Sequence, residues 1–196
     1  GGWWPFVLVA AAYMLVGTRE IGLPGVYMDA VNPDYLVARI LGPAAHGFPA
    51  WVAPGNDLLH RFPVLVGLHH GSGQFWLGLP LFAIFGMSVT ALRIVHMCFA
   101  LAVLAACYAA LLRGGVTRWV ATGAAVALAL DPAFIFAFRT QSYITMAPFA
   151  LVMLAVVAIT RARGSDPPMR WKWATAAGVA TGFAVWGYFI YAFFVP

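Results

Sequence analysis

The stretch TALRIVHMCFALAVLAACYAALL, residues 90–112, is apolar apart from a few polar side chains, among them Arg93 and His96 near its start. A helix needs about 20 predominantly apolar residues to cross a bilayer, so this stretch predicts a transmembrane helix. Of the whole chain, 63% is hydrophobic and 9% is charged, whereas about a quarter of a soluble domain is charged. The sequence therefore predicts an all-α, polytopic transmembrane helix bundle.

Other apolar stretches lie on both sides of this one, and together they form one transmembrane domain, 1–196. We interpret this domain as a fragment of a longer protein. The spans are expected at about residues 3–17, 90–112, 119–138, 143–160 and 173–195. Segment 74–86 is also apolar, but it is short and interrupted by Pro80. We interpret it as an interfacial or re-entrant helix.

Basic residues set the expected topology, because cytoplasmic loops of membrane proteins are enriched in Lys and Arg. Two short turns carry six of them: Arg113, Arg118, Arg161, Arg163, Arg170 and Lys172. If 74–86 does not cross the membrane, both turns lie on the side of the N-terminus, and loop 18–73 lies outside. The net charge of +5 is explained by these turns, and nothing in it predicts binding to nucleic acid. We expect a multi-pass protein of the plasma (inner) membrane.

Loop 18–73 is too polar and too rich in proline to cross a bilayer. Within it, Asn32-Pro33-Asp34 has the pattern of a helix start, with Asn as the cap, Pro in the first turn and an acid at the positive end of the dipole. This short helix is expected to lie along the membrane surface. Asp29 falls in the loop that leads into it.

Two acids of this loop are candidate site residues. Asp29 lies beside an apolar scaffold and could act as a general base on an acceptor hydroxyl; its ordinary explanation is a solvated loop aspartate. Asp34 could bind substrate or a metal, although a charge at a helix start explains it as well. A divalent metal cofactor is left open, with Asp29, Asp34 and His70 as candidate ligands.

His69 and His70 open segment 74–86 and suit phosphate or metal binding; the alternative is interfacial histidines followed by turn-forming glycines. Arg93 and Arg139 lie toward the outer ends of spans, where charges pair or face a functional cavity. Arginine forks bind phosphate well, so either could hold a lipid-linked phosphate. The alternative for both is that the side chain extends to the membrane surface.

The order of these elements resembles a known family. An outside loop with an early Asp is followed by HHGSGQFWLGLPLFAIFG (69–86), by S-x-x-x-x-R (Ser88 to Arg93), and by a long helix that ends in LRGG. Two helices joined through D-P-x-x-x-x-x-x-R (Asp131 to Arg139) come next. This resembles the GT-C membrane glycosyltransferases, in the group of protein O-mannosyltransferase, aminoarabinose transferase and RgtA/B/C/D-like enzymes.

The resemblance implies an inverting glycosyltransferase that moves a sugar from a polyprenyl-phosphate donor to an acceptor hydroxyl on the outer face of the membrane. It assigns the catalytic base to Asp29 and a phosphate-binding role to Arg93 and Arg139. Many members have Asp-Glu at the first position, where this chain has Asp29-Ala30, so a metal site does not transfer directly. The alternative is a non-enzymatic transporter or assembly subunit for envelope lipids or polysaccharides.

Overall fold

The computed structural model describes most of the chain, with the first loop largely outside the described residues. The ranges described are 3–23, 57–58, 62–63, 65–67, 70–86, 88–140 and 143–194. The residues described in these ranges are predominantly helical, as the composition predicts. The helices are α1 (Trp4–Gly17), α4 (Gly73–Phe85), α5 (Val89–Arg113), α6 (Arg118–Ala129), α7 (Pro132–Thr140), α8 (Tyr143–Arg163), α9 (Pro167–Gly187) and the 3-10 helix η1 (Phe189–Phe194).

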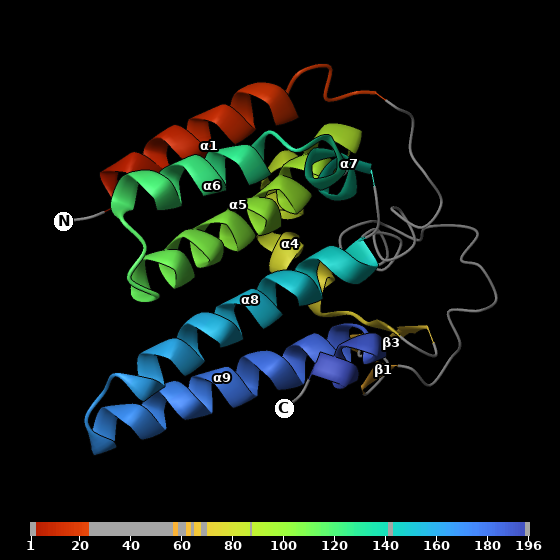
Figure 1. Ribbon diagram of the computed structural model, residues 1–196. Coiled ribbons are helices and arrows are strands. Elements are labelled where there is room, and N and C mark those ends of the chain that lie inside the picture. The colour runs from red at the N-terminus through yellow and green to blue at the C-terminus, as the bar shows by residue number, and fades with distance from the viewer. Residues whose placement is uncertain are drawn as a thin grey trace.

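Helices α1, α5 and α6 pack side by side, α8 and α9 form a long antiparallel pair, and α5 connects the two groups (Figure 1). Two helices are long and apolar enough to cross a membrane: α5 and residues 146–163 of α8. The pair α6 and α7 passes the same test as one broken span. Helix α1 and residues 76–85 are shorter apolar helices. The described part of the chain therefore has two or three candidate membrane spans.

The segment expected as one span over 119–138 is bent by 58° between α6 and α7. Pro132 has no backbone N–H and disfavours helical geometry at the preceding residue, Asp131. The Asp131 carboxylate then accepts a hydrogen bond of 2.8 Å from the backbone N–H of Phe134, which caps the start of α7. The bend is therefore encoded locally by Asp131-Pro132.

The segment expected over 173–195 is not one helix. Helix α9 begins earlier, at Pro167, where two prolines suit the first helical turn. It ends at Gly187, and Tyr188 is extended, with φ −155° and ψ 119°. The chain then turns into η1, so an apolar sequence continues through a change of direction that hydropathy does not detect.

Loop 18–73 was expected to carry short interfacial helices, but its described residues include two short antiparallel ladders. Strand β1 (Asp57–Leu58) pairs with β2 (Phe62–Pro63), and β3 (Leu65–Gly67) pairs with β4 (His70–Gly71). The helix expected after Asn32 lies outside the described residues. Segment 74–86 is helical, as α4, and its Phe82 packs against Leu92 and Val95 of α5.

The main hydrophobic core joins α1, α5 and α6. Tyr13 of α1 and Leu104 of α5 are fully buried, and the facing side of α6 presents Ala121, Ala125 and Ala129. Small residues at every fourth position let helix backbones approach closely. A smaller cluster of Ala155, Ala158 and Ala177 holds α8 against α9.

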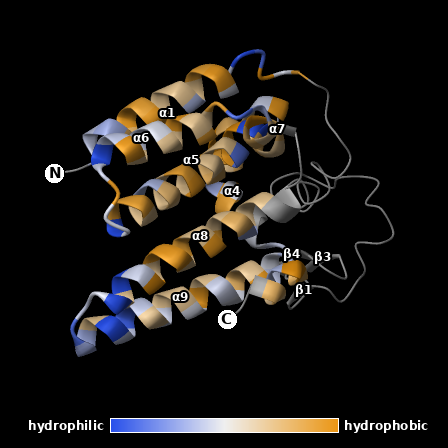
Figure 2. Ribbon diagram, viewed as in Figure 1, coloured by the Kyte–Doolittle hydropathy of each residue, from blue (hydrophilic) through white to orange (hydrophobic). Residues whose placement is uncertain are grey.

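The two basic turns lie at the same end of the bundle. One end of the bundle holds the N-terminus, the turn from α5 to α6 and the turn from α8 to α9. Hydrophilic residues lie at this end (Figures 1 and 2). The exit of α1, the starts of α4 and α5, and the end of α7 lie at the other. Both basic turns therefore lie at the opposite end of the bundle from residues 18–23.

Candidate functional site

Arg93 lies in the second turn of α5 and is buried, with 3% of its surface exposed. Its Nη1 donates hydrogen bonds to the backbone carbonyls of Ile21 and of Leu23, the latter at 3.1 Å. The N-terminal end of a helix disfavours a cation, so these two acceptors offset an unfavourable position. Arg93 is therefore buried against the segment that follows α1 and holds that segment in place.

Arg139 lies in the last turn of α7, the end of a helix that favours a cation. Its Nη2 donates a hydrogen bond to the backbone carbonyl of Glu20. Its Nε is buried and has no hydrogen-bond partner among the described residues. One face of this guanidinium is thus fixed by the chain, and a buried donor remains that a further acceptor could satisfy.

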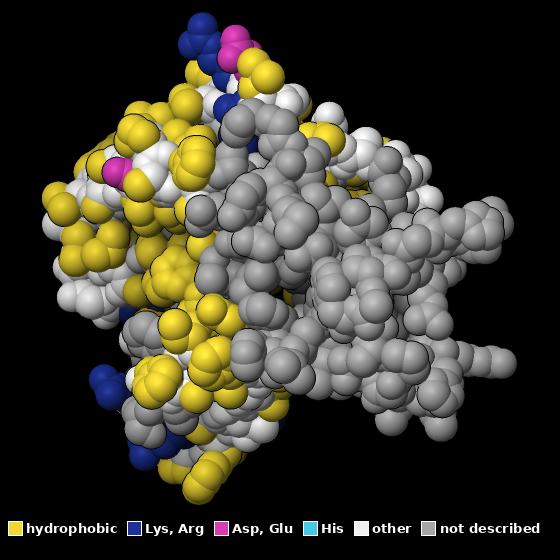
Figure 3. Space-filling view, turned by 90° about the vertical axis from the view of Figure 1, so that its right-hand side faces the viewer, with side chains coloured by type: hydrophobic (Ala, Val, Ile, Leu, Met, Phe, Trp, Pro, Cys, Tyr) yellow, Lys and Arg dark blue, Asp and Glu magenta, His cyan; other side chains and the backbone are white. Residues whose placement is uncertain are grey.

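The two arginines converge on one turn, residues 18–23. Glu20 has a positive φ of 49°, and its carbonyl also accepts the backbone N–H of Leu23 at 2.8 Å. Thr18 closes the end of α1 by donating its hydroxyl to the carbonyl of Met14 at 2.6 Å. Charged side chains stand at the top edge of this end of the bundle, where the chain leaves α1 (Figure 3).

Backbone carbonyls carry no formal charge, so the hydrogen bonds to Ile21, Leu23 and Glu20 orient the two guanidiniums and bring no negative charge of their own. Two neighbouring cations create a positive potential that attracts an anion. Arginine forks bind phosphate and carboxylate groups through paired hydrogen bonds. The arrangement can therefore both fix the entry to loop 18–73 and receive an anionic group there.

The glycine-rich segment before α4 has a packing role. A Cβ at Gly71 would lie 2.4 Å from the carbonyl oxygen of Trp186, and one at Gly73 would lie 2.8 Å from the Trp186 ring. Between them, Ser72 is fully buried, and its Oγ accepts a hydrogen bond of 3.2 Å from Nε1 of Trp76. Close approach of α9 thus accounts for both glycines.

An apolar cavity of about 340 Å³ lies next to this segment, between α4, α8 and α9. Its walls include Trp76 and Leu77 of α4, Pro148 of α8, and Phe183 and Trp186 of α9. Its volume is within the range of small-molecule sites. With almost no polar lining, it suits a hydrocarbon group. Sequence reasoning missed this cavity, because its walls come from three separate segments.

The predicted site residues fall into three groups. Arg93 and Arg139 are brought together by one turn. His70 is in β4, paired with Gly67, and nothing further is described of its side chain. Asp29, Asp34 and His69 lie outside the described residues.

The metal expectation is not decided by the described residues. Among them, no group of three or more His, Cys, Asp or Glu side chains could hold a metal ion. His96, one turn after Arg93, is buried inside the bundle, with 2% of its surface exposed. The candidate ligands Asp29 and Asp34 lie outside the described part of the chain.

Comparison of the chain with family models, with curated proteins and with solved structures finds no match.

Proposed function

We propose that this protein is an inverting glycosyltransferase of the GT-C type, which uses a polyprenyl-phosphate sugar and an acceptor hydroxyl at the outer membrane face. The observation that supports this most is the convergence of Arg93 and Arg139 on residues 20–23. Two arginine side chains from separate helices, which we propose bind the donor phosphate, thus lie at the entry to the loop that carries Asp29.

The proposed reaction is a single in-line displacement. The acceptor oxygen forms a bond to the anomeric carbon, and the bond from that carbon to the donor phosphate breaks. Asp29 takes the proton of the acceptor hydroxyl as general base. The polyprenyl phosphate leaves with the electron pair, and the arginines stabilise its developing charge.

The apolar cavity beside α4 supports a lipid-linked donor. It lies at the same end of the bundle as the two arginines, and it is lined by Trp76, Pro148 and Trp186. An isoprenoid chain buries apolar surface there at about 25 cal/mol per Å². A soluble nucleotide sugar would gain nothing from such a lining.

Asp29→Asn tests the proposed base. The variant keeps the size of the side chain but removes the carboxylate, so we expect sugar transfer in membranes to fall at least about 100-fold, the low end of a general base's contribution. Asp166→Asn is the matched control, because Asp166 precedes α9 at the opposite end of the bundle and its side chain makes no cap hydrogen bond. Full transfer by Asp29→Asn at normal expression would rule out the assignment.

Cleavage of the donor distinguishes a glycosyltransferase from a transporter or assembly subunit. The purified protein, given a radiolabelled polyprenyl-phosphate sugar and a mixture of envelope acceptors, should release free polyprenyl phosphate in step with labelled product. Movement of the intact lipid-linked sugar across vesicles, with no bond cleavage, would favour the transporter. Arg139→Gln should raise the KM for the donor by about tenfold or more, the weight of one charged hydrogen bond.

A further inference from the structure

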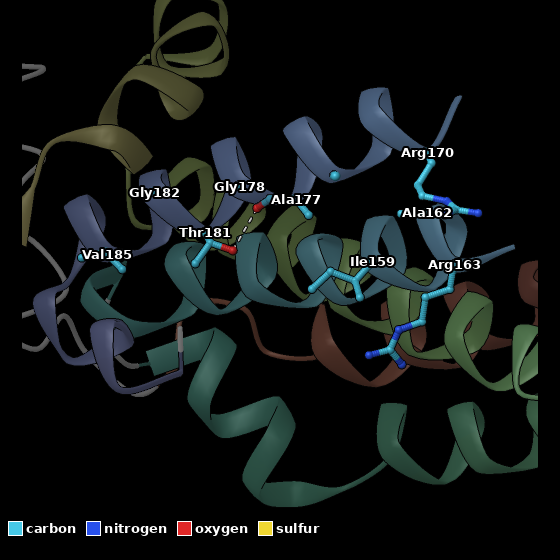
Figure 4. A pocket seen from close by; sticks show the side chains of 10 residues that line it. Ile159, Ala162, Arg163, Arg170, Ala177, Gly178, Thr181, Gly182 and Val185 are labelled. Atoms are coloured by element: carbon cyan, nitrogen blue, oxygen red, sulfur yellow. Dashed lines mark hydrogen bonds between the residues drawn. The ribbon is translucent and has the colours of Figure 1, made fainter. Parts of the chain in front are cut away.

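A long groove runs between α8 and α9, on a different part of the molecule from the arginine pair. Its volume is about 910 Å³. Arg163 of α8 and Arg170 of α9 lie at one end and Val185 lies near the other, with Gly178 and Gly182 between (Figure 4). The groove is therefore basic at one end and apolar along its length.

The residues that the structure describes do not fill this groove. A Cβ added at Gly178 or at Gly182 would meet nothing within 4 Å. The one hydroxyl in the lining, Thr181, donates to the carbonyl of Ala177 at 2.9 Å. The floor is consequently an apolar surface that is open to an occupant from outside the bundle.

Both arginines at the end of the groove have exposed side chains. Arg170 donates to the carbonyl of Ser165 at 3.3 Å, which holds it beside the turn from α8 to α9. The adjacent Arg161 is engaged differently, with its guanidinium 4.5 Å from the centre of the Trp173 ring. Arg163 and Arg170 together thus offer two cations at the mouth of an apolar groove.

The charge at the basic end of the groove distinguishes two possible occupants, a second copy of this chain and an anionic lipid. A second copy packed here about a two-fold axis along the membrane normal would bring both basic ends together, and like charges repel. An anionic lipid has the opposite charge at its head and an apolar tail. Basic pockets between helices on the cytoplasmic side bind such head groups, and the cytoplasmic side is where the sequence predicts this turn.

The length of the groove also fits a lipid. From Arg170 to Val185 the helix rises about 22 Å at about 1.5 Å per residue, and one leaflet with its head groups is about 20–22 Å thick. An acyl chain that starts at the arginines can therefore lie along the groove within its own leaflet. We propose that the groove between α8 and α9 binds an anionic phospholipid, whose phosphate contacts Arg163 and Arg170 and whose acyl chain covers Gly178 and Gly182.

Lipid titration of the protein purified from membranes tests this. Apparent affinities for phosphatidylglycerol and for phosphatidylcholine are measured by native mass spectrometry from the same detergent. We expect phosphatidylglycerol to bind the wild type more tightly. The double variant Arg163→Gln/Arg170→Gln should lose about 30-fold in phosphatidylglycerol affinity, which is about 1 kcal/mol for each arginine, and little in phosphatidylcholine affinity.

The charge-matched control is Arg113→Gln/Arg118→Gln, which removes two arginines from the other turn at the same end. It should change phosphatidylglycerol affinity by less than about twofold. An equal loss in both double variants would mean that general surface charge attracts the lipid, and would overturn the proposal. Binding that does not distinguish the two lipids in the wild type would do the same.

The acyl-chain contact has its own test. Gly178→Leu puts a side chain into the groove at a position where a Cβ meets nothing within 4 Å, and it replaces glycine by a better helix former. The fold should therefore persist, as circular dichroism would check. We expect it to weaken binding of both lipids several-fold, whereas Gly123→Leu on α6, also in open space, should not. Unchanged lipid binding together with a loss of dimers in Gly178→Leu would assign the groove to a second copy and refute the lipid. None of these readouts depends on sugar transfer.

Discussion

Arg93 and Arg139, on two different helices, donate hydrogen bonds to the carbonyls of consecutive residues, Ile21 and Glu20. These hydrogen bonds thereby hold residues 18–23 against the start of α5 and the end of α7. Because backbone carbonyls are the acceptors, these hydrogen bonds do not depend on which side chains the turn carries. The position at which loop 18–73 leaves the bundle is thus set by the two arginines.

Loss of Arg93 should destabilise the protein more than loss of Arg139. Arg93→Gln leaves two carbonyls without their charged donor in a buried position, which costs about 2–3 kcal/mol. Arg139 donates one hydrogen bond, to the carbonyl of Glu20, and is less buried, so Arg139→Gln should cost about 1 kcal/mol. Thermal unfolding in detergent measures both; equal Tm values for the two variants would contradict the arrangement.

Gly71→Ala should destabilise the protein by roughly 1–3 kcal/mol. The new methyl group would meet the backbone carbonyl of Trp186, and a backbone atom cannot move aside without shifting α9. Gly123→Ala is the control, because that Cβ enters open space on a helix and alanine favours helix by up to about 1 kcal/mol. A Tm for Gly71→Ala equal to or above that of Gly123→Ala would show that the contact is absent.

Gly73 and Trp186 should be coupled energetically. The three atoms nearest to a Cβ at Gly73 all belong to the Trp186 ring, the first at 2.8 Å. Trp186→Leu should therefore relieve the strain of Gly73→Ala, with a coupling energy of about 1 kcal/mol or more in a double-mutant cycle. The same cycle with Gly71→Ala should show much less relief, because its nearest atom is the carbonyl oxygen. Identical couplings in the two cycles would be the contrary result.

Ser88→Ala should weaken the start of α5. The Ser88 hydroxyl accepts the backbone N–H of Ala91 at 3.0 Å, and loss of such a cap costs about 1 kcal/mol. Thr117 occupies the equivalent position before α6 but makes no side-chain cap hydrogen bond. Thr117→Ala is therefore expected to lower the Tm by less than Ser88→Ala, and the reverse order would argue against the cap.

Apolar runs in the sequence predicted the positions of the helices, because the helices are mainly long apolar segments. Residues 90–112 fall within α5, and Asp131-Pro132 marks the junction of α6 and α7. The run 173–195 was misinterpreted as one helix, because the turn at Tyr188 has no hydropathic signal. Hydropathy shows whether a segment prefers an apolar environment. It does not show where the chain changes direction inside that environment.

The candidate site was predictable only in part. Arg93 and Arg139 stood out because charges near spans are costly, but their acceptors could not be found from the sequence, since every residue has a carbonyl. The HHGSG segment suggested ligand binding, and the physical reason for its glycines is Trp186, far along the chain. Contacts between segments that are far apart in the sequence can be identified only from the three-dimensional structure.

The contact between Gly71 and Trp186 also bears on the order in which the molecule is built. Trp186 is made about 115 residues after Gly71, roughly 6–23 s later at about 5–20 residues per second. During that interval the start of α4 lacks the part of α9 against which Gly71 and Gly73 pack. The end of the bundle that holds the arginine pair is consequently the last to close, and a nascent chain stopped before α9 should leave it open to proteases.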